Sequence, residues 1–195
     1  ELVGLTHPDF RRRGVFRALL SAAAEQASAF AIPDLLLICE KQSRDGVSAL
    51  AALGGGQPEY SEYALSYGAD SCPDDLPVPE GLSLFPATEA DLDDMARISA
   101  ASFDEPVPQA GHFLAQALHS ENRTQYIARF HGEPIGIGGI GYEEDSATIF
   151  GLAVHPSWQG RGIGRGMIAL LLKEMLTKNN ANILIEVNSA NAAAL

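Results

Sequence analysis

The sequence predicts an α/β fold of the α+β type, arranged as two partial domains. Apolar strand-like runs alternate with amphipathic helical segments along the whole 195-residue chain. A glycine-rich loop, "HPSWQGRGIGRG" at residues 155–166, connects one apolar run to the next. A related loop, "HPDFRRRGVFRA" at residues 7–18, lies earlier in the chain, so the same local structure is expected twice.

The composition favours a folded protein with an acidic surface. Apolar residues make up 46% of the chain, which is enough to form a buried core. The formal net charge of −12 argues against nucleic acid as the main partner, because binding a polyanion requires a basic surface. An acidic surface is compatible with an amine acceptor, although solubility is its more common role.

Neither a metal site nor a membrane partner is expected. The two cysteines, Cys39 and Cys72, lack the spacing of metal ligands and indicate a reducing compartment. No apolar run approaches the roughly 18 residues that a membrane span needs, and no signal peptide is recognisable. We therefore expect a cytoplasmic location. Because the chain begins with Glu1 instead of Met, the sequence leaves open whether a targeting segment lies upstream.

The two loops define an internal repeat. Placing His7 on His155 gives an offset of 148 residues, and the matches continue at this offset without a gap. They pair Pro8 with Pro156, Arg13 with Arg161, Gly14 with Gly162 and Arg17 with Arg165. Because the order of strand, loop, helix and strand is also kept, structural repetition is indicated. The sequence predicts the C-terminal part of a first domain at 1–70, a linker at 71–81 and the N-terminal part of a second domain at 82–195, with both ends cut.

In the first part, helices are expected at residues 14–30 and 46–53, the second ending at glycines 54–56. Strands are expected at 2–7, 34–39 and 59–67. Prolines and acidic residues in "DSCPDDLPVPEG" indicate the linker. Because residues 48–195 span one period in permuted order, strand 59–67 is expected to complete the sheet of the second part, within one chain or across a homodimer.

The second part predicts a longer series of elements. Thr88 and Asp91 form a capping-box-like start for a helix at 89–103, and a shorter helix follows at 111–120. A helix after the glycine-rich loop continues to about Lys178, and residues 188–195 have the pattern of a further helix start. The expected strands are 82–87, 124–130, 134–142, 147–154 and 182–187.

The loop at 159–164 has the chemistry of an anion-binding site. It connects a strand to a helix, and the first N–H groups of a helix lack intrahelical partners. Its glycines let the backbone approach a phosphate or pyrophosphate, and Arg161 and Arg165 add positive charge. A second glycine pattern, "GIGGIG" at 136–141, matches the dinucleotide fingerprint in letters only. It lies inside an expected strand and no helix follows, so close backbone packing is the better interpretation.

These residues resemble the Gcn5-related N-acetyltransferase (GNAT) family. The similarity rests on "VHPSWQGRGIGRGM", on the order of elements around it, and on "EVNSANAAAL", where one Asn ends a strand and a second opens a helix. It covers the second part and, less closely, residues 1–70. The resemblance implies a mixed, mostly antiparallel sheet with helices on both faces, whose central strands separate to admit the cofactor.

The resemblance also implies a set of cofactor contacts and a reaction. Acetyl-CoA would be the co-substrate, and an amine would attack the thioester directly; no residue pattern for a covalent route is visible. Its pantetheine arm would pair with the backbone of residues 152–154, and its pyrophosphate would lie on the loop. The implied cofactor-binding residues are Leu152, Ala153, Val154, Gln159, Gly160, Arg161, Gly162, Ile163, Gly164, Arg165, Asn188 and Asn191.

The catalytic groups are less well specified. Glu143, Glu144 and Glu186 are candidate general bases, and Glu186 is favoured because it interrupts an apolar strand. The alternative is that Glu186 points to solvent on an outward strand face. By family resemblance, the acceptor pocket would come largely from residues 104–111.

The first domain departs from the family pattern in three places. Phe16 stands where the second loop has Gly164, and Glu40 and Ser43 stand where the second part has Asn188 and Asn191. We therefore favour the second domain as the cofactor binder.

The sequence is compatible with three classes of function. The favoured class is an N-acetyltransferase that acts on a small-molecule or peptide amine. A non-catalytic CoA-binding or regulatory module is the alternative, and a nucleotide-binding oxidoreductase is supported only by "GIGGIG".

Overall fold

A computed structural model describes residues 4–32, 35–54, 60–68, 73–178, 182–189 and 191. The chain divides into two compact units, Glu1–Pro58 and Glu59–Leu195. The boundary between these units lies before the strand at 59–67, whereas the predicted division at residue 70 placed that strand with the first part. Whether residues 1–70 correspond to a first GNAT-like domain stays a prediction.

The described residues of the first unit form two helices, α1 (Val15–Ala29) and α2 (Arg44–Leu53), after a short 3-10 turn at Pro8–Phe10. Both predicted helices are confirmed. Ser43 caps α2 because its hydroxyl accepts a hydrogen bond from the Gly46 N–H at 3.2 Å. The helix ends at Gly54, whose φ of +68° suits glycine.

The strands expected in the first unit are not observed in its described residues. Leu36 and Ile38, which lie in the strand expected at 34–39, are 54% and 84% exposed. A strand is stabilised by hydrogen bonds to a neighbouring strand, and no described residue of this unit supplies one. An apolar run therefore does not suffice to make a buried strand here.

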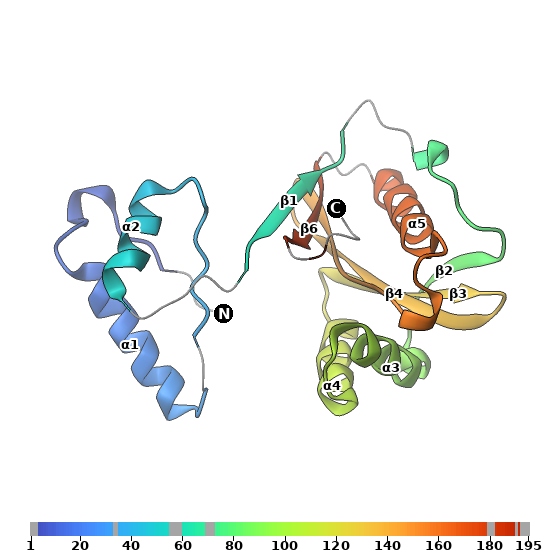
Figure 1. Ribbon diagram of the computed structural model, residues 1–195, viewed down its shortest axis with the longest axis horizontal. Coiled ribbons are helices and arrows are strands. Elements are labelled where there is room, and N and C mark those ends of the chain that lie inside the picture. Colours follow the sequence, from blue (N-terminus) through green and yellow to red (C-terminus); the bar gives the residue numbers. More distant parts are fainter. Residues whose placement is uncertain are drawn as a thin grey trace. The chain divides into compact units, whose positions relative to one another are not determined.

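The second unit is built on a six-stranded sheet in the order β1-β6-β5-β4-β3-β2 (Figure 1). Neighbouring strands are antiparallel except for β5 and β6, which are parallel. The predicted mixed, mostly antiparallel sheet is confirmed. The strands are β1 (Glu62–Ser66), β2 (Leu82–Pro86), β3 (Arg123–Phe130), β4 (Glu133–Tyr142), β5 (Ser146–Val154) and β6 (Asn182–Asn188).

Helices cover both faces of this sheet, as expected. On one face lie α3 (Leu92–Phe103) and α4 (Val107–Leu118), and on the other lies α5 (Ile163–Thr177) (Figure 1). Met95 and Ile98 of α3 pack on Ile127 of β3, while Met167 of α5 packs on the opposite side. Helix α4 begins at Val107, before the predicted start at 111. Pro108 does not prevent this, because proline is tolerated in the first turn of a helix.

Strand β1 pairs antiparallel with β6, with Tyr63 opposite Val187 and Leu65 opposite Ile185. The expectation that strand 59–67 completes the sheet of the second part is therefore confirmed within one chain. This pairing covers the edge of β6 that faces away from β5, so its backbone groups find partners.

The described residues of the predicted linker, 73–81, pack against the second unit. Leu76 and Val78 join the apolar clusters beneath α5, and Pro73 is buried. Lys173 of α5 forms an ion pair with Asp74 at 2.7 Å. This segment therefore belongs to the core of the unit, although its composition is typical of a linker.

Asp91 holds the start of α3 to the sheet. Its carboxylate accepts hydrogen bonds from the N–H and the hydroxyl of Thr88, both at 2.9 Å, and forms an ion pair with Arg129 of β3 at 2.8 Å. The hydrogen bond from the Thr88 backbone, with smaller contributions from the Thr88 hydroxyl and Arg129, lowers the pKa of Asp91. The predicted Thr-x-x-Asp cap is confirmed.

We expect Asp91→Asn to lower the free energy of unfolding at pH 7 by about 1–2 kcal/mol, because charged hydrogen bonds are lost. Since folding depresses the pKa of Asp91, its contribution is present above the unfolded pKa of about 3.9 and disappears as the pH falls through the folded value. Urea unfolding at pH 7 and pH 3 measures the difference. Asp94→Asn, which removes an exposed pairing with Arg97, is the control and is expected to change stability by less than about 0.5 kcal/mol. An equal effect of Asp91→Asn at both pH values would contradict this account.

Gly166 is required by packing. A Cβ at this position would lie 2.7 Å from Pro79 Cδ and 2.7 Å from Leu82 Cδ2, whereas at Gly164 the nearest heavy atom would be Val154 Cγ2 at 3.8 Å. We expect Gly166→Ala to destabilise the second unit by about 1–3 kcal/mol through overpacking. Gly164→Ala, on the same helix, is expected to be neutral or stabilising by up to about 1 kcal/mol. Thermal unfolding of both variants tests this, and equal melting temperatures would contradict it.

Candidate functional site

The parallel pairing of β5 and β6 stops partway along the two strands. It runs from Ser146 opposite Asn182 to Ile149 opposite Ile185 and is absent for residues 150–154 of β5. Strand β5 stays paired with β4 up to Val154, after a register shift near Gly151, whose φ is +58°. The backbone edge of β5 that faces β6 is therefore unpaired with β6 over residues 152–154.

The glycine-rich loop begins where β5 ends. After a 3-10 turn at Pro156–Trp158, Gly160 and Gly162 adopt φ values of +75° and +77°, and Gly162 caps α5. No heavy atom lies within 4 Å of a Cβ built at either glycine. The first helical hydrogen bond runs from the Gly166 N–H to the Gly162 carbonyl at 3.0 Å, so the preceding N–H groups are those that a helix start leaves free for an anion.

Charge at the loop comes from two exposed arginines. The guanidinium of Arg161 lies over the ring of Trp158, 4.7 Å from its centroid, and Arg165 lies in the first turn of α5. Cation–π contact fixes the Arg161 side chain while leaving the edge of its guanidinium able to donate hydrogen bonds.

The carbonyl of Val154 connects three parts of the site. It accepts a hydrogen bond from Gln159 Nε2 at 2.9 Å and another from the Ser102 hydroxyl at 3.2 Å. Val154 is only 9% exposed, so an unsatisfied carbonyl here would be costly. The side chain of Gln159 therefore positions the loop, and Ser102 fixes the last turn of α3 against the end of β5. The sequence did not predict the role of Ser102, because the local pattern around it does not indicate a contact with Val154, which lies 52 residues away along the chain.

The other expected cofactor residues lie at the same end of the sheet. Because β5 and β6 are parallel, their carboxyl ends share one edge, which places Asn188 beside the diverging strands. Asn191 follows in a turn, its N–H donating to the Asn188 carbonyl at 2.9 Å. Residues 190 and 192–195 of the expected following helix lie outside the described residues.

The candidate bases occupy different environments. Glu186 lies opposite Ala64 of β1, one residue beyond the last residue of β6 that pairs with β5. Its side chain is exposed, which agrees with the alternative that Glu186 points to solvent. Glu143 and Glu144 are exposed at the turn between β4 and β5, at the opposite end of β5 from the loop. The fold therefore separates these two from the loop.

The segment expected to line the acceptor side is mostly helical. Only Asp104 to Pro106 connect α3 to α4, since α4 begins at Val107. Asp104 has a φ of +54° and ends α3, and its N–H donates a hydrogen bond to the Ala100 carbonyl. The connection between the two helices is thus shorter than the segment 104–111 expected from the family resemblance.

The loop geometry recurs in the first unit at the predicted offset. Pro8–Phe10 forms the equivalent 3-10 turn, Gly14 caps α1 with a φ of +82°, and Arg13 lies over the Phe10 ring at 5.4 Å. His7 and His155 both accept a hydrogen bond on Nδ1 from the N–H two residues later, at 3.4 and 3.3 Å. The predicted repetition of this local structure is confirmed.

The first unit differs where the sequence departs. Arg12 takes a φ of +59° where the second loop has Gly160, and partly buried Phe16 stands at the position of Gly164. The turn equivalent to Asn188–Asn191 also recurs, with the Ser43 N–H donating to the backbone carbonyl of the exposed Glu40 at 2.9 Å. The turns are therefore repeated, whereas the side chains that they present are different.

The "GIGGIG" segment lies within β4 and serves packing. A Cβ at Gly136 would lie 2.7 Å from Met167 Sδ, and a Cβ at Gly139 would lie 2.4 Å from the Phe150 ring. No helix follows, since β5 begins at Ser146. The interpretation as a strand with close neighbours is confirmed, and the segment carries no dinucleotide site.

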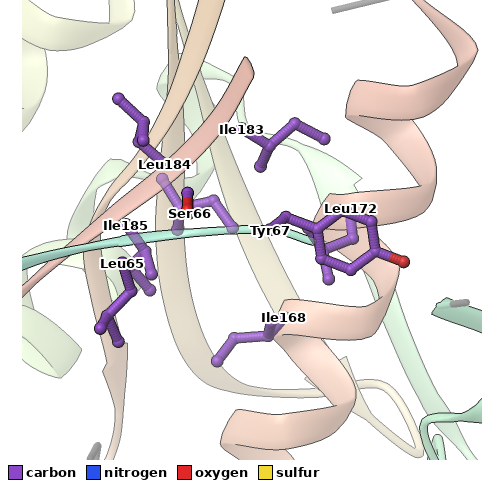
Figure 2. A pocket seen from close by; sticks show the side chains of 9 residues that line it. Leu65, Ser66, Tyr67, Ile168, Leu172, Ile183, Leu184 and Ile185 are labelled. Carbon is purple, nitrogen blue, oxygen red and sulfur yellow. The ribbon is translucent and has the colours of Figure 1, made fainter. Parts of the chain in front are cut away.

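A cavity of about 170 Å³ lies between α5 and the β1–β6 edge of the sheet (Figure 2). Its walls are mainly aliphatic and include no charged side chain, so it is poorly suited to a phosphate or an ammonium. The lining residues are Leu65, Ser66, Tyr67, Ile149, Ile168, Leu172, Ile183, Leu184 and Ile185.

A second polar cluster lies at the C-terminal end of α5, away from the loop. Burial raises the pKa of Tyr126, and hydrogen bonds to Tyr142 and Glu174 act in the same direction. Lys178 donates to the Tyr142 hydroxyl at 3.0 Å, and this bond raises the pKa of Lys178. The cluster ties α5 to β3 and β4 and is structural.

In the part of the chain that the structure describes, no group of three or more His, Cys, Asp or Glu side chains is arranged to hold a metal ion. None of the described helices is both long and apolar enough to cross a membrane.

The fold and the site together define a class: an α+β domain in which a glycine-rich, helix-capping loop follows a strand that diverges from its parallel neighbour. The sequence model of the acetyltransferase (GNAT) family matches residues 92–195, more than half of the chain. The chain therefore belongs to the GNAT family, and the resemblance seen in the sequence is confirmed.

Individual relatives of the chain are also named as acetyltransferases. The chain is 41% identical over 51 residues to the ribosomal protein bS18-alanine N-acetyltransferase of Salmonella typhimurium, a match that covers 26% of the chain and 34% of that enzyme. It is 27% identical over 199 residues to the mycothiol acetyltransferase of Clavibacter michiganensis subsp. michiganensis, covering 96% of the chain and 63% of that enzyme. A tandem GNAT protein from the clavulanic acid biosynthesis pathway has a similar fold, with a TM-score of 0.68 and 20% identity over 96% of this chain and 65% of that one.

Proposed function

We propose that the chain carries an acetyl-CoA-dependent N-acetyltransferase activity in its second unit. The observation that carries this proposal is the separation of β5 from β6 directly before the loop that caps α5. An unpaired strand edge followed by an anion-binding helix start suits a ligand that combines an amide-containing arm with a pyrophosphate. Acetyl-CoA has both parts.

The cofactor contacts follow from this arrangement. The backbone of Leu152, Ala153 and Val154 would pair with the pantetheine amides, and the N–H groups of residues 159–164 would surround the pyrophosphate. Arg161 and Arg165 would supply charge-assisted hydrogen bonds to its oxygens. Gln159 contributes its backbone, since its side chain is bound to Val154. Asn188 and Asn191 would lie beside the pantetheine arm at the carboxyl end of β6.

The proposed reaction is direct transfer. The nitrogen of a neutral amine attacks the thioester carbonyl, an N–C bond forms, and the C–S bond breaks to release the CoA thiolate. The amine proton must leave as the amide forms, and Glu186, next to the divergence of β5 and β6, is our candidate to accept it. No acyl-enzyme is required.

The acceptor is proposed as an amine on a small molecule or a peptide. One relative is named for acetylating the alanine of a ribosomal protein and another for acetylating mycothiol, which are different kinds of acceptor. The tandem arrangement, a cytoplasmic location and a homodimer are likewise proposals.

A non-catalytic role is the second candidate, for the first unit alone. Its loop repeats the helix cap, but none of its described residues forms a strand beside that loop, and Phe16 replaces a glycine. We infer that the cofactor is held by the second unit and that the first unit is a degenerate copy.

Calorimetric titration of acetyl-CoA into the chain tests this assignment with a matched pair of variants. Gly162→Phe and Gly14→Phe place the same side chain at two helix caps with nearly equal φ, so the backbone strain of about 1–2 kcal/mol is similar in both. We expect Gly162→Phe to weaken acetyl-CoA binding by at least about tenfold, which is about 1.4 kcal/mol, because the ring covers the anion site. Gly14→Phe is expected to bind like the wild type.

Two other outcomes would change the assignment. Two binding events in the wild type, each lost with its own substitution, would show that the first unit also holds the cofactor. Unchanged affinity in Gly162→Phe would remove the loop from the binding site.

A further inference from the structure

A carboxylate that the mechanism has not used lies at the end of α3. Glu105 accepts a hydrogen bond on Oε1 from the Ser99 hydroxyl at 2.7 Å, and Ser99 is only 6% exposed. Glu105 itself is partly exposed. One oxygen is therefore fixed by a buried donor while the side chain keeps access to solvent.

The backbone turns Glu105 back along α3. Asp104 adopts a left-handed conformation, with a φ of +54°, and the Glu105 N–H approaches the Ala100 carbonyl at 3.3 Å. Pro106 follows directly, and a residue before proline is restricted to extended conformations. The position of the carboxylate is thus determined by the turn and by Ser99 together.

This position adjoins the end of β5. Ser99 and Ser102 are three residues apart on α3, so they share a helix face with about 5–6 Å between their Cβ atoms. Ser102 donates to the Val154 carbonyl, and Ser99 donates to Glu105. Glu105 therefore lies about one helical turn from the residue whose backbone would meet the pantetheine arm.

The charge of Glu105 has no counterpart nearby. Among the described residues, no Lys, Arg or His nitrogen lies within ion-pair distance of its carboxylate, whereas Asp91, Asp94 and Asp74 each have a basic partner. A fixed and partly desolvated carboxylate is stabilised by a cation, and an ammonium group supplies both charge and hydrogen-bond donors.

We propose that Glu105 binds the protonated amine of the acceptor. Its carboxylate would select alkylamines, which are charged at neutral pH, over amines that are neutral, and would hold them near the end of β5. The bound ammonium then releases one proton to solvent, and the resulting neutral amine attacks the thioester. The inference rests on the proposed acetyltransferase function and adds a specificity-determining residue to it.

The test compares three single substitutions in the whole chain. Glu105→Gln keeps an acceptor for Ser99 but removes the charge, and Glu105→Asp keeps the charge. Glu121→Gln removes an exposed charge in the turn after α4, outside the segment expected to line the acceptor side. Acetyl-CoA affinity and thermal unfolding are measured first, and we expect all three variants to resemble the wild type in both.

The amine measurements then use a panel of primary alkylamines, an alanine-ended peptide and an aromatic amine that is neutral at pH 7.5. For Glu105→Gln we expect KM for the charged amines to rise about tenfold or more with little change in kcat, and KM for the aromatic amine to stay unchanged. Binding of the same amines to the CoA-saturated protein, followed by ligand-observed NMR, should weaken in parallel. Glu105→Asp and Glu121→Gln are expected to keep most of the affinity for charged amines.

The outcomes separate the two proposals. Wild-type KM and amine binding in Glu105→Gln would overturn the role of Glu105, as would the absence of amine binding to a wild-type chain that binds acetyl-CoA. Equal losses for charged and neutral amines would also overturn it. Absence of acetyl-CoA binding to the wild type would overturn the proposed function together with this inference.

Discussion

The incomplete pairing of β5 with β6 is the constraint on which the site depends. Four residue pairs join the two strands, and β5 then continues on β4 alone to Val154. A buried backbone edge needs partners, because unpaired N–H and C=O groups cost free energy. The Val154 carbonyl obtains two internal donors, Ser102 and Gln159, and these bonds bring the end of α3 and the loop to one point.

Glycine has two separate uses in this fold, and both serve the same region. Gly160 and Gly162 supply positive φ angles that open the helix start. Gly136 and Gly166 have no such angle; they let α5 lie close to β4 and to the segment before β2. The first pair gives the backbone of the loop its shape, and the second pair holds the helix that carries this loop against the sheet.

The two loops share the same local structure but lie in different surroundings. Both have a 3-10 turn, a left-handed glycine cap and an arginine over an aromatic ring, so the turn chemistry is encoded in a dozen residues. Only the second is followed and preceded by strands of a described sheet. A glycine-capped helix start can therefore be repeated by a short sequence alone, whereas the diverging strands lie beside the second loop because of the sheet around it.

The sequence by itself determined the helices, the strands of the second unit, the loop at 159–164 and its repetition, because periodicity, caps and glycine spacing act over short distances. It also carried the family resemblance. Only the tertiary structure decided that β1 joins β6, that Leu36 and Ile38 stay exposed, and that Ser102 donates to the Val154 carbonyl while Ser99 donates to Glu105. These features depend on hydrogen bonds between residues distant in the chain, or on the presence of a neighbouring strand. A local pattern contains no information about either, which is why the cap of α5 at Gly162 was foreseen and the hydrogen bonds of Ser102 and Glu105 were not.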